Sequence, residues 1–101
     1  MSYFVYILRC SDKSYYTGVT NNIQKRVYEH SSGLIKGYTF KRLPIQLVYF
    51  QEFLKIIDAI SYEKQLKGWR RDKKEALIEG DINRLKKLSK SYFNHPSSSS
   101  G

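Results

Sequence analysis

The sequence has few of the features, such as disulfides and zinc sites, that stabilise small proteins lacking a hydrophobic core. It has one cysteine, Cys10, among 101 residues, so a single chain can form neither a disulfide framework nor a cysteine-based zinc site. No apolar run approaches the ~20 residues of a membrane helix, and the N-terminus lacks a basic leader. We therefore expect a cytoplasmic protein that does not enter a membrane.

Acidic residues are also scarce. The chain has 9 Asp and Glu against 18 Lys and Arg, a net charge of +9. Such a surplus favours an anionic polymer as partner, with nucleic acid ahead of an acidic membrane. On charge alone, a ribosome-associated or merely soluble basic protein is the alternative. The few acids are scattered along the chain, so the clustered carboxylates of a two-metal nuclease are not expected.

Aromatic side chains, in contrast, are abundant. They make up 15% of the sequence, and nine residues are tyrosine. Buried tyrosines usually need a partner for the hydroxyl, which favours a core that reaches a polar surface. The length fits one domain, which we assign to residues 1–92. The serine-rich residues 93–101 are expected to be a disordered tail or a cloning remnant.

The first half of the chain predicts a small antiparallel sheet. Residues 3–10 and 15–20 are rich in aromatic and β-branched side chains, and the short turn between them favours a hairpin. Residues 3–10 are apolar on both alternating faces, so this strand should be central and covered on both sides. A third strand is predicted over residues 45–53 after an irregular loop over residues 34–42.

Helices are predicted between and after the strands. One follows the second strand to about His30, with Ile23, Val27 and Tyr28 facing inward. A second starts near residue 56, with an apolar stripe formed by Ala59, Tyr62, Leu66 and Trp69. Two shorter helices are expected over residues 71–78, ended by Gly80, and after the N-cap Asp81. This order predicts a segregated α+β fold rather than a Rossmann arrangement.

Two pairs of residues could serve phosphodiester cleavage, which needs a proton acceptor for water and positive charge beside the phosphate. Cross-strand pairing could bring the hydroxyls of Tyr6 and Tyr16 to one face, although two core tyrosines are the alternative. Arg26 and His30 lie one helical turn apart, where they could clamp a phosphate and move a proton. A surface arginine with a helix-terminal histidine is the alternative.

Glu63 is the candidate carboxylate for a metal ion. Its neighbours Tyr62 and Leu66 should point toward the sheet, so Glu63 could point obliquely into a cleft. The alternative is a solvated glutamate paired with Lys67 at the i+4 position.

Taken in order, these residues resemble the GIY-YIG nuclease module. The pattern reads Val5-Tyr6-Ile7, then Tyr16-Thr17-Gly18 about ten residues later, then Arg26 and His30, then the single downstream Glu63. The resemblance covers roughly residues 3–70 and is closest to the short stand-alone members. It implies a three-stranded antiparallel sheet flanked by helices, and a one-step hydrolysis assisted by a single Mg²⁺ or Mn²⁺.

The resemblance also implies a role for each of these residues. Tyr6 and Tyr16 match the two motif tyrosines, and which of them helps to deprotonate the water stays open. Arg26 matches the phosphate-binding arginine, His30 a position with a proton-transfer role, and Glu63 the sole metal-binding carboxylate. A phenol with an ordinary pKa near 10 is a poor base. Arg26, His30 or the metal must therefore stabilise the phenolate or share the task.

The motifs depart from the family pattern at a few positions. The first reads Val-Tyr-Ile instead of Gly-Ile-Tyr, and the second reads Tyr-Thr-Gly. Val19 stands where some repair and restriction members have a lysine, so any activity here must do without that charge. None of these changes removes a predicted catalytic group.

Basic residues suggest where nucleic acid would lie. Residues 64–74 contain six basic side chains and Trp69. They form a candidate phosphate track, with a solvated basic face as the alternative. Trp69 could stack on a base, but its place at the end of the apolar stripe favours the core. The residues that we expect to contact nucleic acid are Asn22, Lys36, Lys41, Arg42, Lys64, Lys67, Arg70 and Arg71.

The leading hypothesis is a metal-dependent endonuclease acting on DNA, in repair or recombination, although the sequence does not distinguish DNA from RNA. Structure-selective binding is expected because little chain is left for an added element that reads the major groove. The first alternative is a nucleic-acid-binding module on the same fold with little or no catalysis. The second is a subunit that needs a protein partner for specificity. The oligomeric state and the physiological metal stay open.

Overall fold

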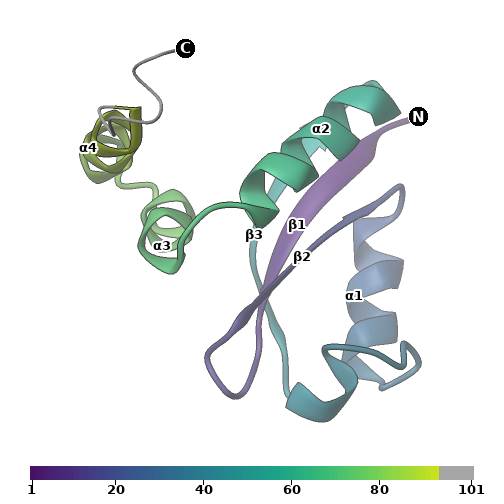
Figure 1. Ribbon diagram of the computed structural model, residues 1–101. Helices are drawn as coiled ribbons and strands as arrows, with labels where there is room; N and C mark the ends of the chain where they lie inside the picture. The colour runs from purple at the N-terminus through teal and green to yellow at the C-terminus, as the bar shows by residue number, and fades with distance from the viewer. Residues whose placement is uncertain (94–101) are drawn as a thin grey trace. The chain divides into compact units, whose positions relative to one another are not determined.

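The computed structural model describes residues 1–93, which form parts of two compact units, Met1–Lys67 and the chain from Gly68 onward. The first unit contains β1 (Tyr3–Arg9), β2 (Tyr15–Thr20), α1 (Ile23–Ser31), the 3-10 turn η1 (Phe40–Arg42), β3 (Gln46–Phe53) and α2 (Ile56–Lys67) (Figure 1). The second contains α3 (Arg71–Glu79) and α4 (Ile82–Phe93). The predicted α+β class is confirmed. The predicted tail lies outside the described residues from residue 94 onward, and the single domain over residues 1–92 stays a prediction.

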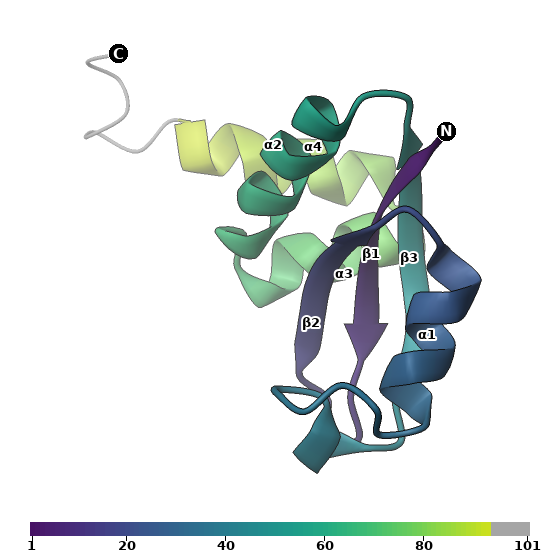
Figure 2. The ribbon, with the colours of Figure 1, turned by 90° about the vertical axis from the view of Figure 1, so that its right-hand side faces the viewer.

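The three strands form one antiparallel sheet in the order β2-β1-β3, as Figure 2 shows. The prediction that the first strand is central is therefore confirmed. Val5, Tyr6, Ile7 and Leu8 are all 0% exposed. Because successive side chains of a strand point to opposite faces, this run can be buried only if both faces of β1 are covered.

The two long helices of the first unit cover opposite faces of the sheet (Figures 1 and 2). On one face, the Tyr6 hydroxyl lies 3.0 Å from Nε2 of His30 in α1. The neighbouring residue Ile7 pairs with Tyr49 of β3, whose hydroxyl lies 2.8 Å from that of Tyr62 in α2. Because Tyr6 and Ile7 are adjacent on one strand, their partners must lie on different faces.

Helix α1 begins as the sequence predicts but faces the sheet differently. The Asn22 side chain caps the helix by accepting a hydrogen bond from the Lys25 amide at 3.0 Å. His30 in the last turn is buried, whereas Tyr28 is 65% exposed. The expected inward position of Tyr28 is therefore wrong. The inner stripe of α1 passes through half-buried Val27 and buried His30, and Tyr28 lies beside that stripe.

Helix α2 ends at Lys67, so the expected stripe is one residue too long. Ala59 and Leu66 are buried within α2 as predicted. Trp69 follows the helix instead of extending its stripe, and it is half-buried under Lys73, whose Nζ lies 4.1 Å from the ring centroid. Glycine disfavours helix continuation, and Gly68 stands directly between the end of α2 and Trp69.

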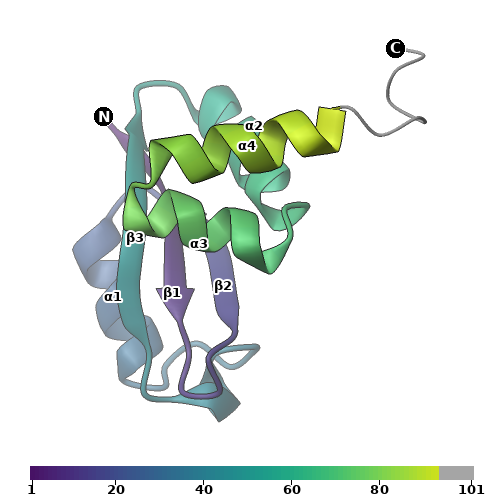
Figure 3. The same cartoon turned by 90° about the vertical axis from the view of Figure 1, so that its left-hand side faces the viewer.

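In the second unit, α3 and α4 run antiparallel side by side (Figure 3). Gly80 ends α3 in the left-handed conformation at φ 70°, which glycine adopts without strain. The Asp81 carboxylate then accepts a hydrogen bond from the Arg84 amide at 3.0 Å at the start of α4. Both helix boundaries match the predicted ones. Among the described residues, no helix has the length and apolar character that crossing a membrane requires.

The predicted loop between α1 and β3 is irregular except for η1, and polar contacts hold it against the turn between β1 and β2. Arg42 Nε lies 3.0 Å from the Asp12 carboxylate, and Arg42 Nη1 donates a hydrogen bond to the Tyr38 carbonyl at 2.8 Å. The Ser11 amide donates to the Arg42 carbonyl at 2.9 Å. The loop thereby holds Thr39 in the interior, where it is 1% exposed.

Gly18 is required by the packing of the tyrosine opposite it. It pairs with Tyr6 across the β1–β2 ladder, and a Cβ atom at this position would lie 2.5 Å from the Tyr6 hydroxyl oxygen. The structure shows that its missing side chain makes room for the ring of Tyr6.

We predict that Gly18→Ala lowers the free energy of unfolding by about 1–3 kcal/mol, because the Tyr6 ring must leave its buried position. Gly37→Ala is the control, since no atom lies within 4 Å of a Cβ built there. Urea denaturation followed by circular dichroism measures both variants. Equal stability of the two variants would contradict the packing role of Gly18.

Candidate active site

The two motif tyrosines lie on one face of the sheet, as predicted. In the β1–β2 ladder Tyr6 pairs with Gly18 and Leu8 pairs with Tyr16, so the tyrosines are diagonal neighbours two residues apart in register. Their ring centroids are 6.3 Å apart. Tyr6 is fully buried and Tyr16 is half-buried. Of the two side chains, Tyr16 is therefore the one that reaches solvent.

His30 joins the tyrosines to the loop between α1 and β3. It is 1% exposed, and its ring centroid lies 5.9 Å from that of Tyr6 and 5.2 Å from that of Tyr16. Nε2 lies 3.0 Å from the Tyr6 hydroxyl, and Nδ1 lies 2.7 Å from the Thr39 hydroxyl. His30 lies in the last turn of α1 and Arg26 is exposed, as the alternative states, but His30 is also a core residue with both ring nitrogens paired.

Thr39 is the one residue of this hydrogen-bonded chain that the sequence analysis missed. The loop over residues 34–42 has no periodicity, so nothing in the pattern marks one of its hydroxyls as buried. A general signal existed, because a buried imidazole needs a partner for its second nitrogen. That requirement does not say which of the nearby polar residues supplies the partner.

Burial keeps both Tyr6 and His30 neutral at neutral pH. Burial, followed by the charge of Tyr16, raises the pKa of Tyr6 from 10.0 to about 12. The charge of Arg26 and its hydrogen bonding act in the opposite direction, and the charge of Glu63 raises the value slightly further. Burial and then the charge of Arg26 lower the pKa of His30, while Glu29 opposes this shift. The resting pair is a phenol and an uncharged imidazole.

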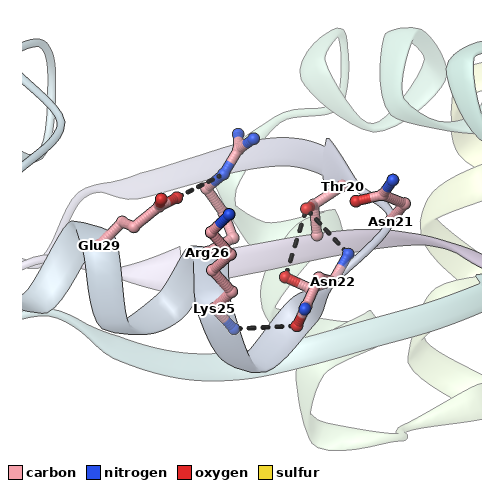
Figure 4. A pocket seen from close by; sticks show the side chains of 6 residues that line it. All are labelled: Thr20, Asn21, Asn22, Lys25, Arg26 and Glu29. Atoms are coloured by element: carbon pink, nitrogen blue, oxygen red, sulfur yellow. Dashed lines mark hydrogen bonds and ion pairs between the residues drawn. The ribbon is translucent and has the colours of Figure 1, made fainter.

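Arg26 lies beside a polar hollow at the start of α1 (Figure 4). Its Nε is 3.3 Å from the Glu29 carboxylate, and the side chain is 39% exposed. The residues that line the hollow are Thr20, Asn21, Asn22, Lys25, Arg26 and Glu29. Two cations at a helix start suit a phosphate group, which would compete with Glu29 for Arg26. The Asn22 carboxamide oxygen already caps α1, so any contact of Asn22 with substrate would fall to its amide nitrogen.

Glu63 forms the predicted ion pair and is also largely buried. Its carboxylate lies 3.2 Å from Lys67 Nζ, so the expected i, i+4 pairing is present. The Glu63 side chain is only 15% exposed, and its charge acts on the phenol of Tyr6 from the other helix layer. Glu63 is therefore not a fully solvated residue.

The donor atoms suit a hydrated metal ion rather than a protein cage. Within residues 1–93, no group of three or more His, Cys, Asp and Glu is arranged to hold a metal. Mg²⁺ typically keeps several waters and uses one or two carboxylates together with substrate phosphates. Glu63 could supply one such carboxylate, although it is not among the residues that line the hollow at α1. Lys67 would have to release Glu63 for the carboxylate to bind a metal.

Several of the predicted nucleic-acid contacts already have partners in the protein. Arg42 is tied to Asp12 and Tyr38, and Lys36 Nζ lies 3.9 Å from the Phe40 ring centroid. In the second unit, Arg70 pairs with Asp72 at 3.1 Å and Arg71 with Glu75 at 3.1 Å. Lys41 and Lys64 are exposed. The predicted track over residues 64–74 is thus divided between the two units.

Comparison with known proteins agrees with this architecture. A family model described as the GIY-YIG catalytic domain matches residues 2–76. A UPF0213 protein of Haloquadratum walsbyi is 45% identical over 83 residues, which are 80% of this chain and 93% of that protein. A UPF0213 protein of Clostridium perfringens is 45% identical over 75 residues, 74% of this chain and 81% of that protein. The solution NMR structure of a UPF0213 protein from Bacillus halodurans aligns with a TM-score of 0.53 at 38% identity. The alignment covers 88% of this chain and 98% of that structure.

An antiparallel sheet that carries two motif tyrosines beside a helical arginine and histidine defines the class of small α+β nuclease modules. The chain belongs to the GIY-YIG family, and its relatives at 38–45% identity are UPF0213 proteins. Membership of this family implies nuclease activity.

We predict that stability falls more steeply between about pH 10 and pH 12 in the wild type than in Tyr6→Phe. The pKa of Tyr6 rises from 10.0 to about 12 in the folded protein, so the unfolded chain loses this proton first. The stabilisation that the protonated Tyr6 hydroxyl contributes is complete below pH 10.0 and is lost as the pH rises through about 12. Urea midpoints across this range measure the effect, and Tyr28→Phe, on the exposed side of α1, should follow the wild type. Parallel curves for the wild type and Tyr6→Phe would show that Tyr6 ionises normally.

Proposed function

We propose that the protein is a metal-dependent endonuclease of the cytoplasm that hydrolyses phosphodiester bonds in DNA and selects substrates by structure, in repair or recombination. The observation that carries this proposal is the buried hydrogen bond between Tyr6 and His30, beside Tyr16 and Arg26. A hydroxyl, an imidazole and a guanidinium within one cluster supply a proton path and positive charge for a phosphate.

The geometry suggests a division of labour among these residues. Tyr16 is half-buried and is the tyrosine that can meet a water from solvent. Tyr6 lies behind it and can pass its hydroxyl proton to Nε2 of His30, which leaves a phenolate that would take the proton of Tyr16 as Tyr16 takes a proton from the water. Arg26 stabilises this phenolate and holds the phosphate at the hollow. A phenol with a pKa near 12 needs this help to act as a base.

Glu63 would hold the Mg²⁺ or Mn²⁺ ion, which supplies Lewis acidity at the phosphate when bound. The support for this assignment is that Glu63 is the carboxylate whose charge acts on Tyr6 across the sheet. The exposed Asp58 of the same helix has no such connection with the tyrosines, and it supplies a matched control.

We predict that the purified protein cuts labelled branched or nicked DNA in Mn²⁺ or Mg²⁺, and that Glu63→Gln and Tyr6→Phe each slow cutting at least about 100-fold. Glu63→Gln removes the metal ligand, and Tyr6→Phe removes the proton path. Single-turnover cleavage on branched, nicked and single-stranded substrates, with chelator as the metal-free reference, measures both effects.

Asp58→Asn and Tyr28→Phe are the controls, and both should cut like the wild type. If every substrate is bound but none is cut, the protein is a binding module or needs a partner subunit. If Glu63→Gln cuts normally, the metal assignment is wrong even when cleavage itself is established.

The charge distribution supports a sequence-independent contact with the DNA backbone. We predict that Lys41→Ala and Lys64→Ala each weaken DNA binding equally for all DNA sequences. Each substitution should also reduce the magnitude of the slope of log K against log salt concentration by about 1. Arg42→Ala should instead lower stability, because Arg42 anchors its loop to Asp12 and Tyr38. Fluorescence anisotropy at several salt concentrations, with a thermal melt of each variant, separates the two effects.

A further inference from the structure

The partner of His30 on the side away from Tyr6 has no assigned role. Thr39 is 1% exposed, and its hydroxyl oxygen lies 2.7 Å from Nδ1 of His30. The other ring nitrogen, Nε2, lies 3.0 Å from the Tyr6 hydroxyl. These contacts form a continuous buried chain from the loop between α1 and β3, through the imidazole, to the motif tyrosine on β1.

The direction of the hydrogen bonds in this chain is decided by the number of available protons. A neutral imidazole carries one N–H, so one ring nitrogen donates and the other accepts. Transfer of the Tyr6 hydroxyl proton to His30 requires Nε2 to accept from that hydroxyl, 3.0 Å away. This arrangement places the imidazole proton on Nδ1, facing the Thr39 oxygen at 2.7 Å.

We propose that Thr39 is a positioning residue that holds His30 in the Nδ1–H tautomer, with the lone pair of Nε2 directed at the Tyr6 hydroxyl. The inference rests on the proposed function, because it concerns the proton path of that reaction. A histidine tautomer is set by the hydrogen bond that the other nitrogen makes. Thr39 would therefore decide whether His30 can accept the proton of Tyr6.

The proton balance shows why this tautomer is needed. When the proton of Tyr6 moves to Nε2, the products are a phenolate and an imidazolium that carries protons on both nitrogens. Nδ1–H keeps its hydrogen bond to Thr39 throughout, so the step needs no reorganisation on that side. In the Nε2–H tautomer, the nitrogen that faces Tyr6 has no lone pair, and the transfer is blocked.

The loop holds Thr39 by contacts that also reach the second motif tyrosine. The Arg42 amide donates to the Thr39 carbonyl at 2.9 Å, and the Arg42 side chain is tied to Asp12. Tyr38, next to Thr39, stacks on Tyr16 with the rings inclined by 25° and the centroids 6.1 Å apart. The same short segment thus orients His30 and packs against Tyr16.

The test is ¹⁵N NMR of histidine-labelled protein. The chain has only two histidines, so a His95→Gln variant assigns the His30 signals. At about pH 8, where an imidazole is neutral, the wild type and Thr39→Ser should show a protonated Nδ1 and an unprotonated Nε2. Thr39→Val keeps the side-chain shape but removes the hydroxyl, and it should shift His30 toward the Nε2–H tautomer.

Cleavage rates provide the second readout. Thr39→Val should lower the single-turnover rate by about tenfold or more without weakening DNA binding, and Thr39→Ser should restore the rate. A wild type in the Nε2–H tautomer, or a Thr39→Val variant with an unchanged tautomer, would overturn the inference. The wild-type spectrum alone decides the case if Thr39→Val does not fold. Absence of cleavage by the wild type would count against the proposed function, while the tautomer still decides the role of Thr39.

Discussion

The hydrogen bond between the Tyr6 hydroxyl and the His30 imidazole is the contact on which the rest of the first unit depends. Tyr6 is fully buried at the centre of the sheet, and a buried hydroxyl without a partner costs about 1–3 kcal/mol. The partner must come from α1, because α2 covers the other face. This requirement fixes how α1 lies on the sheet, calls for a residue without a side chain at Gly18, and calls for a second partner for His30 at Thr39.

The two faces of the sheet show two uses of a buried tyrosine. On the face covered by α2, Tyr62 is paired with Tyr49, and burial raises the pKa of Tyr62 as well. A phenol paired with another phenol has no acceptor of useful basicity, so this contact serves packing. Tyr6 is paired with an imidazole, with a guanidinium close by. In the proposed mechanism, the same buried side chain therefore gains its reactivity from the chemistry of its partners, not from its position in the sheet.

The sequence was most informative where a local pattern determines the structure. The alternation of apolar residues around Tyr6 predicts a central strand, and the spacing of Arg26 and His30 predicts that they share a helix face. The contact between Thr39 and His30 was not predictable, because it depends on how an aperiodic loop closes. Arg42 shows the same limit, since its charge suggested a phosphate contact. Its partner Asp12 is 30 residues away in sequence, and only the folded chain brings the two together.

Trp69 shows a different limit of sequence patterns. In the sequence, apolar residues recur at helical spacing through Gly68 to Trp69, whereas helix α2 ends at Lys67. A hydrophobic period states where side chains would point if the helix continued, but it does not state where the helix ends. Glycine at the next position was the available signal, and it should have outweighed one further apolar residue at helical spacing.

The contact between Glu63 and Lys67 bears on whether the proposed metal ligand could also be stable in the resting protein. A half-buried carboxylate without a partner would be costly, and Lys67 supplies the compensating charge at 3.2 Å. The Lys67 side chain is 55% exposed, and an ion pair with one exposed member contributes about 0–1 kcal/mol. A divalent cation at the same carboxylate interacts with twice the charge. Lys67 can therefore leave for water at little cost, so its pairing with Glu63 does not oppose metal binding.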